Sequence, residues 1–91
     1  MPTIAEFYGI VIQMFFADHN PPHFHARYGS AKALVRISDG EILQGRLPPT
    51  AARLVKEWAL ARREGLEHNW RCGQDYLAML RIAGPDGDAD E

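Results

Sequence analysis

The segment from Asp18 to Gly29, DHNPPHFHARYG, gathers residue types that bind metal ions or transfer protons. It holds three of the four histidines of the chain, together with an aspartate and an arginine. Imidazole nitrogens and carboxylate oxygens are ligands of zinc and related transition metals. Side chains two apart on a strand project from one face, so His23 and His25 can share a metal ion. Asp18 or His19 would supply the third ligand, and the sequence places no fourth one.

The same segment supports three other interpretations. In metal-independent RNA cleavage, histidine acts as acid or base and arginine stabilises charge on the phosphorus; His23, His25 and Arg27 have these types. A structural interpretation is that the histidines order the turn at 20–22 through hydrogen bonds, with Asp18 accepting from an imidazole. The last is a contact surface for a partner protein. The catalytic residues, if the chain is an enzyme, stay unassigned.

Four strands are predicted. Branched and aromatic residues indicate a buried strand at 9–16, alternation of apolar residues indicates strands at 23–28 and 31–37, and a hairpin signal at 38–40 indicates a short strand at 41–45. In the second and third strands, one set of side chains faces the core and the other set points away from it. The predicted inward set is Phe24, Ala26, Tyr28, Ala31, Ala33, Val35 and Ile37. The predicted outward set is His23, His25, Arg27, Lys32 and Arg36, with Leu34 as an apolar exception.

The second half of the chain has helical periodicity. Pro49 is placed near a first helical position, where a missing N–H costs nothing. An apolar stripe at i, i+3, i+4 and i+7 then predicts a helix that packs on the sheet; it consists of Ala51, Leu54, Val55 and Trp58. Gly65 is expected to kink or end this helix, with Leu66 and Trp70 continuing its apolar side. Residues 76–82 fit either a helix end or an extended return strand.

Together these patterns predict an α+β fold, an antiparallel β-meander of about four strands followed by one or two C-terminal helices packed on one face. The other face would be open to solvent. Neighbouring cations on that face repel each other, so we expect an acidic protein partner or RNA to use it. The residues expected to make this contact are His19, His23, His25, Arg27, Lys32 and Arg36.

Length and composition indicate one soluble domain over residues 1–83 with a disordered acidic tail over 84–91. The tail holds four of the twelve acidic residues and no basic one, so residues 1–83 carry ten basic against eight acidic side chains. The single cysteine, Cys72, excludes an internal disulfide, and no motif ties it to a catalytic histidine. No apolar run predicts a membrane span, and a cytoplasmic location is expected. Dimerisation would extend the modest core, so a homodimer is one expectation.

The N-terminal sequence MPTIAEFYGIVIQMFFADHNPPHFHARYG resembles the domain of unknown function 4160 family of small bacterial proteins. The similarity includes the Asp-His-x-Pro-Pro-His-Phe-His motif and continues through Leu47-Pro48, Leu54-Val55-x-x-Trp58 and Asn69-Trp70, over roughly residues 1–82. The chain departs from the family pattern over 72–79 and in its acidic tail. The resemblance implies no established activity. It implies a small protein partner encoded nearby, in the manner of a toxin–antitoxin module, with RNA as a candidate target. No cofactor is expected, with a transition metal such as zinc as the alternative.

Overall fold

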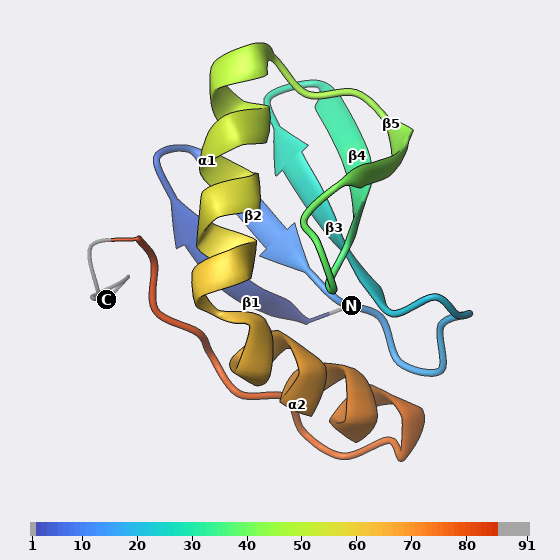
Figure 1. The fold of residues 1–91 in the computed structure, drawn as a ribbon. Helices are drawn as coiled ribbons and strands as arrows, with labels where there is room; N and C mark the ends of the chain where they lie inside the picture. Colours follow the sequence, from blue (N-terminus) through green and yellow to red (C-terminus); the bar gives the residue numbers. More distant parts are fainter. Residues whose placement is uncertain (1, 86–91) are drawn as a thin grey trace.

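The computed structural model describes residues 2–85 and consists of a five-stranded antiparallel sheet followed by two helices (Figure 1). The strands are β1 (Thr3–Phe7), β2 (Ile10–Gln13), β3 (His23–Tyr28), β4 (Ala31–Arg36) and β5 (Ile42–Gly45), and they pair in sequence order. The helices are α1 (Pro49–Ala61) and α2 (Arg63–Gln74). This architecture confirms the predicted α+β meander, with five strands instead of about four.

The first hairpin is the main difference from the predicted sheet. A strand was expected over 9–16, but β2 covers only Ile10–Gln13, and β1 precedes it. Tyr8 and Gly9 connect the two strands with φ angles of 53° and 80°. A two-residue turn with positive φ at both positions matches the twist of an antiparallel pair, and glycine adopts it without strain. Tyr8-Gly9 is therefore the turn signal that the sequence reading missed.

The two helices meet at Arg62 and not at Gly65. Arg62 has φ −113° and ψ 24°, and its N–H still donates to the carbonyl of Trp58. Gly65 lies inside α2, where a Cβ would stand 3.5 Å from the Ile82 side chain. The predicted stripe on α1 does face the core: Ala51, Val55 and Trp58 are buried, while Leu54 is half-buried.

The segment after α2 returns along the sheet without forming a helix or a regular strand. The N–H of Ile82 donates to the carbonyl of Ile4 at 2.8 Å, beside β1. The buried Asn69 side chain binds the backbone of Leu80 twice, because its amide donates to the carbonyl and its oxygen accepts from the N–H, each at 2.8 Å. This segment is neither of the two forms expected for 76–82, although its extended course is close to the second.

The expected disordered tail begins at residue 84, but the structure holds its first residue in place. Arg62 donates to the carbonyls of Ala83 and Gly84, and Gly84 is buried. Residues 86–91 lie outside the described part of the chain. Within residues 2–85 no helix is both long enough and apolar enough to cross a membrane.

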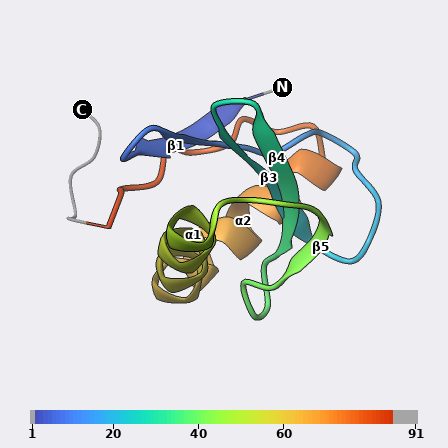
Figure 2. The same cartoon turned by 90° about the horizontal axis from the view of Figure 1, so that it is seen from above.

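The core lies between one face of the sheet and the helices. Seen from above, α1 lies on one side of the curved sheet (Figure 2). Phe24 and Ala26 of β3 and Val35 of β4 point toward α1 and are fully buried. The alternate residues of the same strands therefore face away from α1, and this outer face positions the candidate site.

Candidate functional site

Asp18, His23 and His25 converge at one end of this outer face, where the connection between β2 and β3 returns to the sheet. We call these three residues the histidine cluster. One potential ligand atom from each lies within 4.8 Å of the other two. The Oδ2 atom of Asp18 is 3.0 Å from Nε2 of His23 and 3.4 Å from Nε2 of His25.

His23 is the buried member of the histidine cluster. It was expected to be exposed, but its relative exposure is only 5%, because its ring packs beside Trp70 of α2 with the centroids 5.4 Å apart. Alternation places it on the outer face, yet α2 and the connection at 14–22 cover this end of the sheet (Figure 1). Its Nδ1 atom is 2.8 Å from the carbonyl oxygen of Pro21. This contact agrees with the interpretation that a histidine orders the proline turn.

His25 is partly exposed and forms the outer edge of the cluster. Its ring stacks on Phe15 with centroids 4.2 Å apart and planes 10° from parallel. Its side chain keeps 23% exposure, so one side of the imidazole remains open to solvent. The phenyl ring and the Asp18 carboxylate together fix its orientation.

The loop that carries Asp18 is attached to the end of α2. The N–H of Ala17 donates to the carbonyl of Gly73, and Gln74 donates to the carbonyl of Asp18, each at 3.1 Å. The N–H of His19 donates to Oδ1 of Asp18 at 2.8 Å, which leaves Oδ2 directed at the imidazoles. Partial burial acts to raise the pKa of the Asp18 carboxyl. The His19 amide and the two neighbouring histidines outweigh this effect, so the pKa lies below its ordinary value.

The other predicted site residues are divided between different environments. Arg27 and Lys32 are directly opposite each other on β3 and β4, and both are exposed. Neither has an ion-pair partner among residues 2–85. Arg36 instead binds the Asp39 carboxylate through two hydrogen bonds of 3.1 and 2.9 Å. His19 is exposed, and its ring does not join the histidine cluster.

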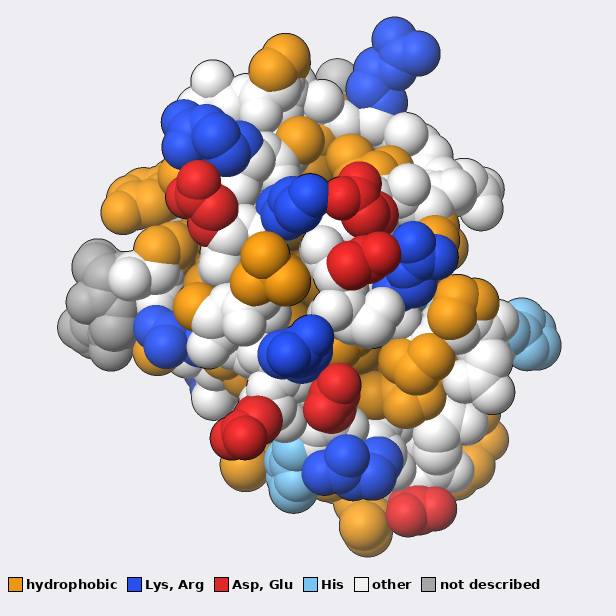
Figure 3. Space-filling view, viewed as in Figure 1, with side chains coloured by type: hydrophobic (Ala, Val, Ile, Leu, Met, Phe, Trp, Pro, Cys, Tyr) orange, Lys and Arg blue, Asp and Glu red, His pale blue; other side chains and the backbone are white. Residues whose placement is uncertain are grey.

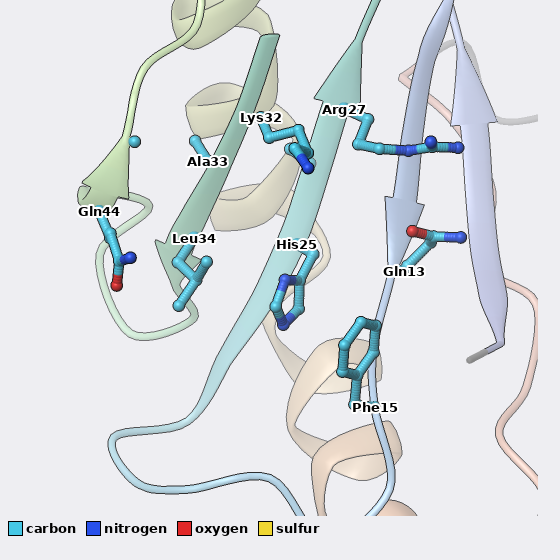
Figure 4. Close-up of a pocket in the computed structure, with 10 residues that line it drawn as sticks. Gln13, Phe15, His25, Arg27, Lys32, Ala33, Leu34 and Gln44 are labelled. Carbon is cyan, nitrogen blue, oxygen red and sulfur yellow. The ribbon is translucent and has the colours of Figure 1, made fainter. Parts of the chain in front are cut away.

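A concave region of about 480 Å³ extends from His25 across the outer face, and we call it the sheet hollow (Figure 4). In this view the helices lie behind the sheet, and the lining side chains point away from them. The hollow is lined by Gln13, Phe15, His25, Ala26, Arg27, Lys32, Ala33, Leu34, Gln44 and Gly45.

Seven lining residues were not predicted as site residues, and four of them have side chains larger than that of alanine: Gln13, Phe15, Leu34 and Gln44. Strand register brings two of them in, since Gln13 pairs with His25 and Gln44 pairs with Leu34. Leu34 was placed correctly on the outward face, but a single apolar residue on a surface is common and gave no signal for a site.

Comparison with known proteins identifies one family. The model of "Domain of unknown function (DUF4160)" matches residues 9–71, which is more than half of the chain and includes the histidine cluster. Neither the curated proteins nor the solved structures gave a significant match.

Proposed function

Since the chain belongs to the DUF4160 family, whose description names no activity, we propose a function from its own residues: it binds single-stranded RNA through the sheet hollow. The observation that carries this proposal is the pair of neighbouring, exposed cations Arg27 and Lys32, which have no counter-charge among residues 2–85. A volume of about 480 Å³ lies within the range of small-ligand sites. The hollow is therefore large enough for one segment of an extended chain.

The phosphate backbone of RNA supplies the missing negative charge. Lys and Arg side chains that neutralise phosphates release condensed counterions, which favours binding at low salt. Residues 1–83 carry an excess of two positive charges. Because that net charge is small, phosphate binding depends on where the positive side chains lie. Arg27 and Lys32 place two of them at the sheet hollow.

Aromatic and amide groups beside these cations favour RNA over an acidic protein. Single-stranded bases stack on aromatic side chains and present their edges to hydrogen-bonding groups, and sheet faces are used in this way by RNA-binding domains. Phe15 and His25 form a stacked pair at one end of the hollow. Gln13 and Gln44 provide amides that can donate to and accept from base edges.

The opposite side of the molecule lacks this combination. Figure 3 shows the helix side, where basic and acidic side chains are interspersed. Arg53 is 3.6 Å from Glu57, and Lys56 is 2.5 Å from Glu41. These cations are already compensated, so the helix side is expected to bind phosphate more weakly.

The proposal covers binding and not cleavage. Metal-independent cleavage by an acid and base pair of histidines would need His23 beside His25, but the His23 ring is buried and contacts Pro21 and Asp18. We also propose a place in a cytoplasmic toxin–antitoxin-type module, which rests on the family resemblance. The small protein partner of such a module would compete with RNA for the sheet hollow.

Fluorescence anisotropy with a labelled oligouridylate of about 12 nucleotides tests the proposal, since single-strand sites span about 4–16 nucleotides. The test variant is Arg27→Ala/Lys32→Ala. The matched control is Arg53→Ala/Lys56→Ala, which removes the same charges from the helix side. Two lost phosphate contacts should lower the steepness of log affinity against log salt by about 1.4, at about 0.7 per contact.

The control variant should keep the wild-type steepness. Absence of RNA binding by the wild-type protein, or equal losses in both double variants, would contradict an RNA site in the hollow. Binding that does not change with salt would also contradict it, because the proposed contacts are to phosphate.

A further inference from the structure

We propose that Asp18, His23 and His25 bind one divalent transition-metal ion of the zinc type. This site is distinct from the proposed RNA contacts of Arg27 and Lys32, and it does not depend on them. Its ligand atoms would be Oδ2 of Asp18 and the Nε2 atoms of the two histidines. The argument uses the spacing of these atoms, the hydrogen bonding of His23 and the exposure of the cluster.

The spacing of the three atoms fits one small ion. Zinc binds imidazole nitrogen and carboxylate oxygen at about 2.1 Å, and two such ligands in a tetrahedral site lie about 3.4 Å apart. The carboxylate oxygen of Asp18 is 3.0 and 3.4 Å from the two imidazole nitrogens. One potential ligand atom from each residue lies within 4.8 Å of the other two, so small side-chain rotations bring the three around a common centre.

The two ring nitrogens of His23 face different groups: Nδ1 faces the Pro21 carbonyl oxygen, and Nε2 faces the Asp18 carboxylate. The carbonyl oxygen of Pro21 can only accept, so Nδ1 of His23, at 2.8 Å, carries the proton of that contact. In the neutral imidazole that a metal ion requires, the lone pair is then on Nε2, which faces the Asp18 carboxylate 3.0 Å away. A cation between the two atoms satisfies both. Metal-bound histidines commonly donate the other ring N–H to a backbone carbonyl in this way.

One member of the histidine cluster is buried and held in place, and the other two are partly exposed to solvent. His23 is 5% exposed and is held between Pro21 and Trp70. The side chains of His25 and Asp18 keep 23% and 20% exposure, which gives an ion a route from solvent. The end of α2 fixes the backbone of the Asp18 loop, so the three ligands are positioned before an ion arrives.

The donor set selects the class of metal. Imidazole favours zinc, nickel, cobalt and copper, whereas calcium and magnesium prefer oxygen ligands. Two histidines and one carboxylate leave at least one coordination position for water or another ligand. His25 also lines the sheet hollow, so this open position is close to the groups that we propose for RNA binding.

Isothermal titration of the tag-free protein with zinc chloride tests the site. The wild-type chain should bind one ion, and magnesium chloride should give no saturable heat. Asp18→Asn and His25→Gln should each weaken zinc binding by at least about 100-fold, since even changes around metal ligands cost about 10- to 100-fold. His23 is left unchanged here because it is buried. Circular dichroism checks that both variants remain folded.

Two controls separate this site from other zinc-binding groups. His19→Gln removes the neighbouring exposed histidine and should leave the affinity unchanged. His68→Ala addresses the pair on α2 in which His68 Nε2 lies 3.4 Å from the Cys72 sulfur, and it should also have no effect. Cobalt bound at the proposed site should show no thiolate charge-transfer absorption, because no cysteine belongs to the cluster.

The proposal is overturned if the wild-type protein shows no saturable zinc binding, or if Asp18→Asn binds zinc as tightly as the wild type. Loss of binding in His68→Ala would instead place the ion on α2 and would also overturn it. RNA binding by Arg27→Ala/Lys32→Ala and by Asp18→Asn is measured separately in the presence of a chelator. A failure of one proposal is therefore visible independently of the other.

Discussion

The two ends of the outer sheet face differ in how their charges are compensated. At the histidine cluster, Asp18 lies between two imidazoles, and hydrogen bonds to the loop and to α2 fix the groups. A few residues along the same strands, Arg27 and Lys32 are exposed and have no ion-pair partner among the described residues. A fixed cluster of two imidazoles and one carboxylate suits a small cation. An uncompensated cationic pair suits an extended anion.

The largest expected effect concerns zinc and stability. A ligand that binds only the folded state stabilises it by about 2.7 kcal/mol at 100 times its dissociation constant. The wild-type protein should therefore melt at a clearly higher temperature with zinc, and Arg27→Ala/Lys32→Ala should show the same increase. Asp18→Asn should show almost none. Differential scanning calorimetry measures these melting temperatures. If zinc raised the melting temperature equally in all three proteins, the metal would not be bound at the histidine cluster.

A smaller effect on stability is expected when one side chain at each end of the outer sheet face is replaced by alanine in the absence of metal. His23→Ala removes a buried ring and leaves the Pro21 carbonyl without its donor, which should cost about 2 kcal/mol of unfolding free energy. Lys32→Ala is exposed and should change stability by less than about 0.5 kcal/mol. Urea unfolding of both variants gives the comparison. Similar losses would show that the exposed end is also structural.

Phe15 connects the two ends, because its ring stacks on His25 and also lines the sheet hollow. Phe15→Leu keeps an apolar side chain but removes a stacking surface for a base. Since stacking contributes about 1–3 kcal/mol per base, RNA affinity should fall by about fivefold, at the low end of that range. Anisotropy with the same oligouridylate measures this. Unchanged RNA affinity would limit the RNA contact to the cations.

The smallest effect is expected at the exposed pair of Arg36 and Asp39. The hydrogen bonds from Arg36 hold the pKa of the Asp39 carboxyl below its ordinary value. The stabilisation that results is present above the ordinary pKa and disappears as the pH falls through the lowered one. Asp39→Asn should thus lower the urea midpoint slightly near about pH 7 and make no difference near about pH 2. A difference that grows on acidification would contradict this assignment.

Strand alternation and helical periodicity predicted which side chains of β3, β4 and α1 face the core. Alternation along β3 and β4 placed His25, Arg27 and Lys32 on the outer face, and the 3.6-residue period placed Val55 and Trp58 against the sheet. The β1 strand was missed because Glu6 interrupts its short apolar pattern and the Tyr8-Gly9 turn was not recognised.

The site was predictable in composition and less so in arrangement. The sequence grouped Asp18, His19, His23 and His25, but spacing alone did not separate the three that converge from His19, which does not. The burial of His23 depends on Trp70, which is 47 positions later in the chain. The capture of Arg36 by Asp39 likewise depends on how the turn after β4 folds. A contact between distant elements decided the first outcome, and the local conformation of a turn decided the second.

The return segment after α2 has a consequence for recombinant work. The family match ends at residue 71, yet the indole N–H of Trp58 donates to the carbonyl of Ala83, and both polar atoms of the Asn69 amide bind Leu80. An expression fragment trimmed to residues 9–71 would lose these acceptors and donors together with β1, and it would open the hydrophobic core to water. The smallest autonomous unit is therefore expected to extend from residue 2 to at least residue 84, and truncation series should be planned from those limits.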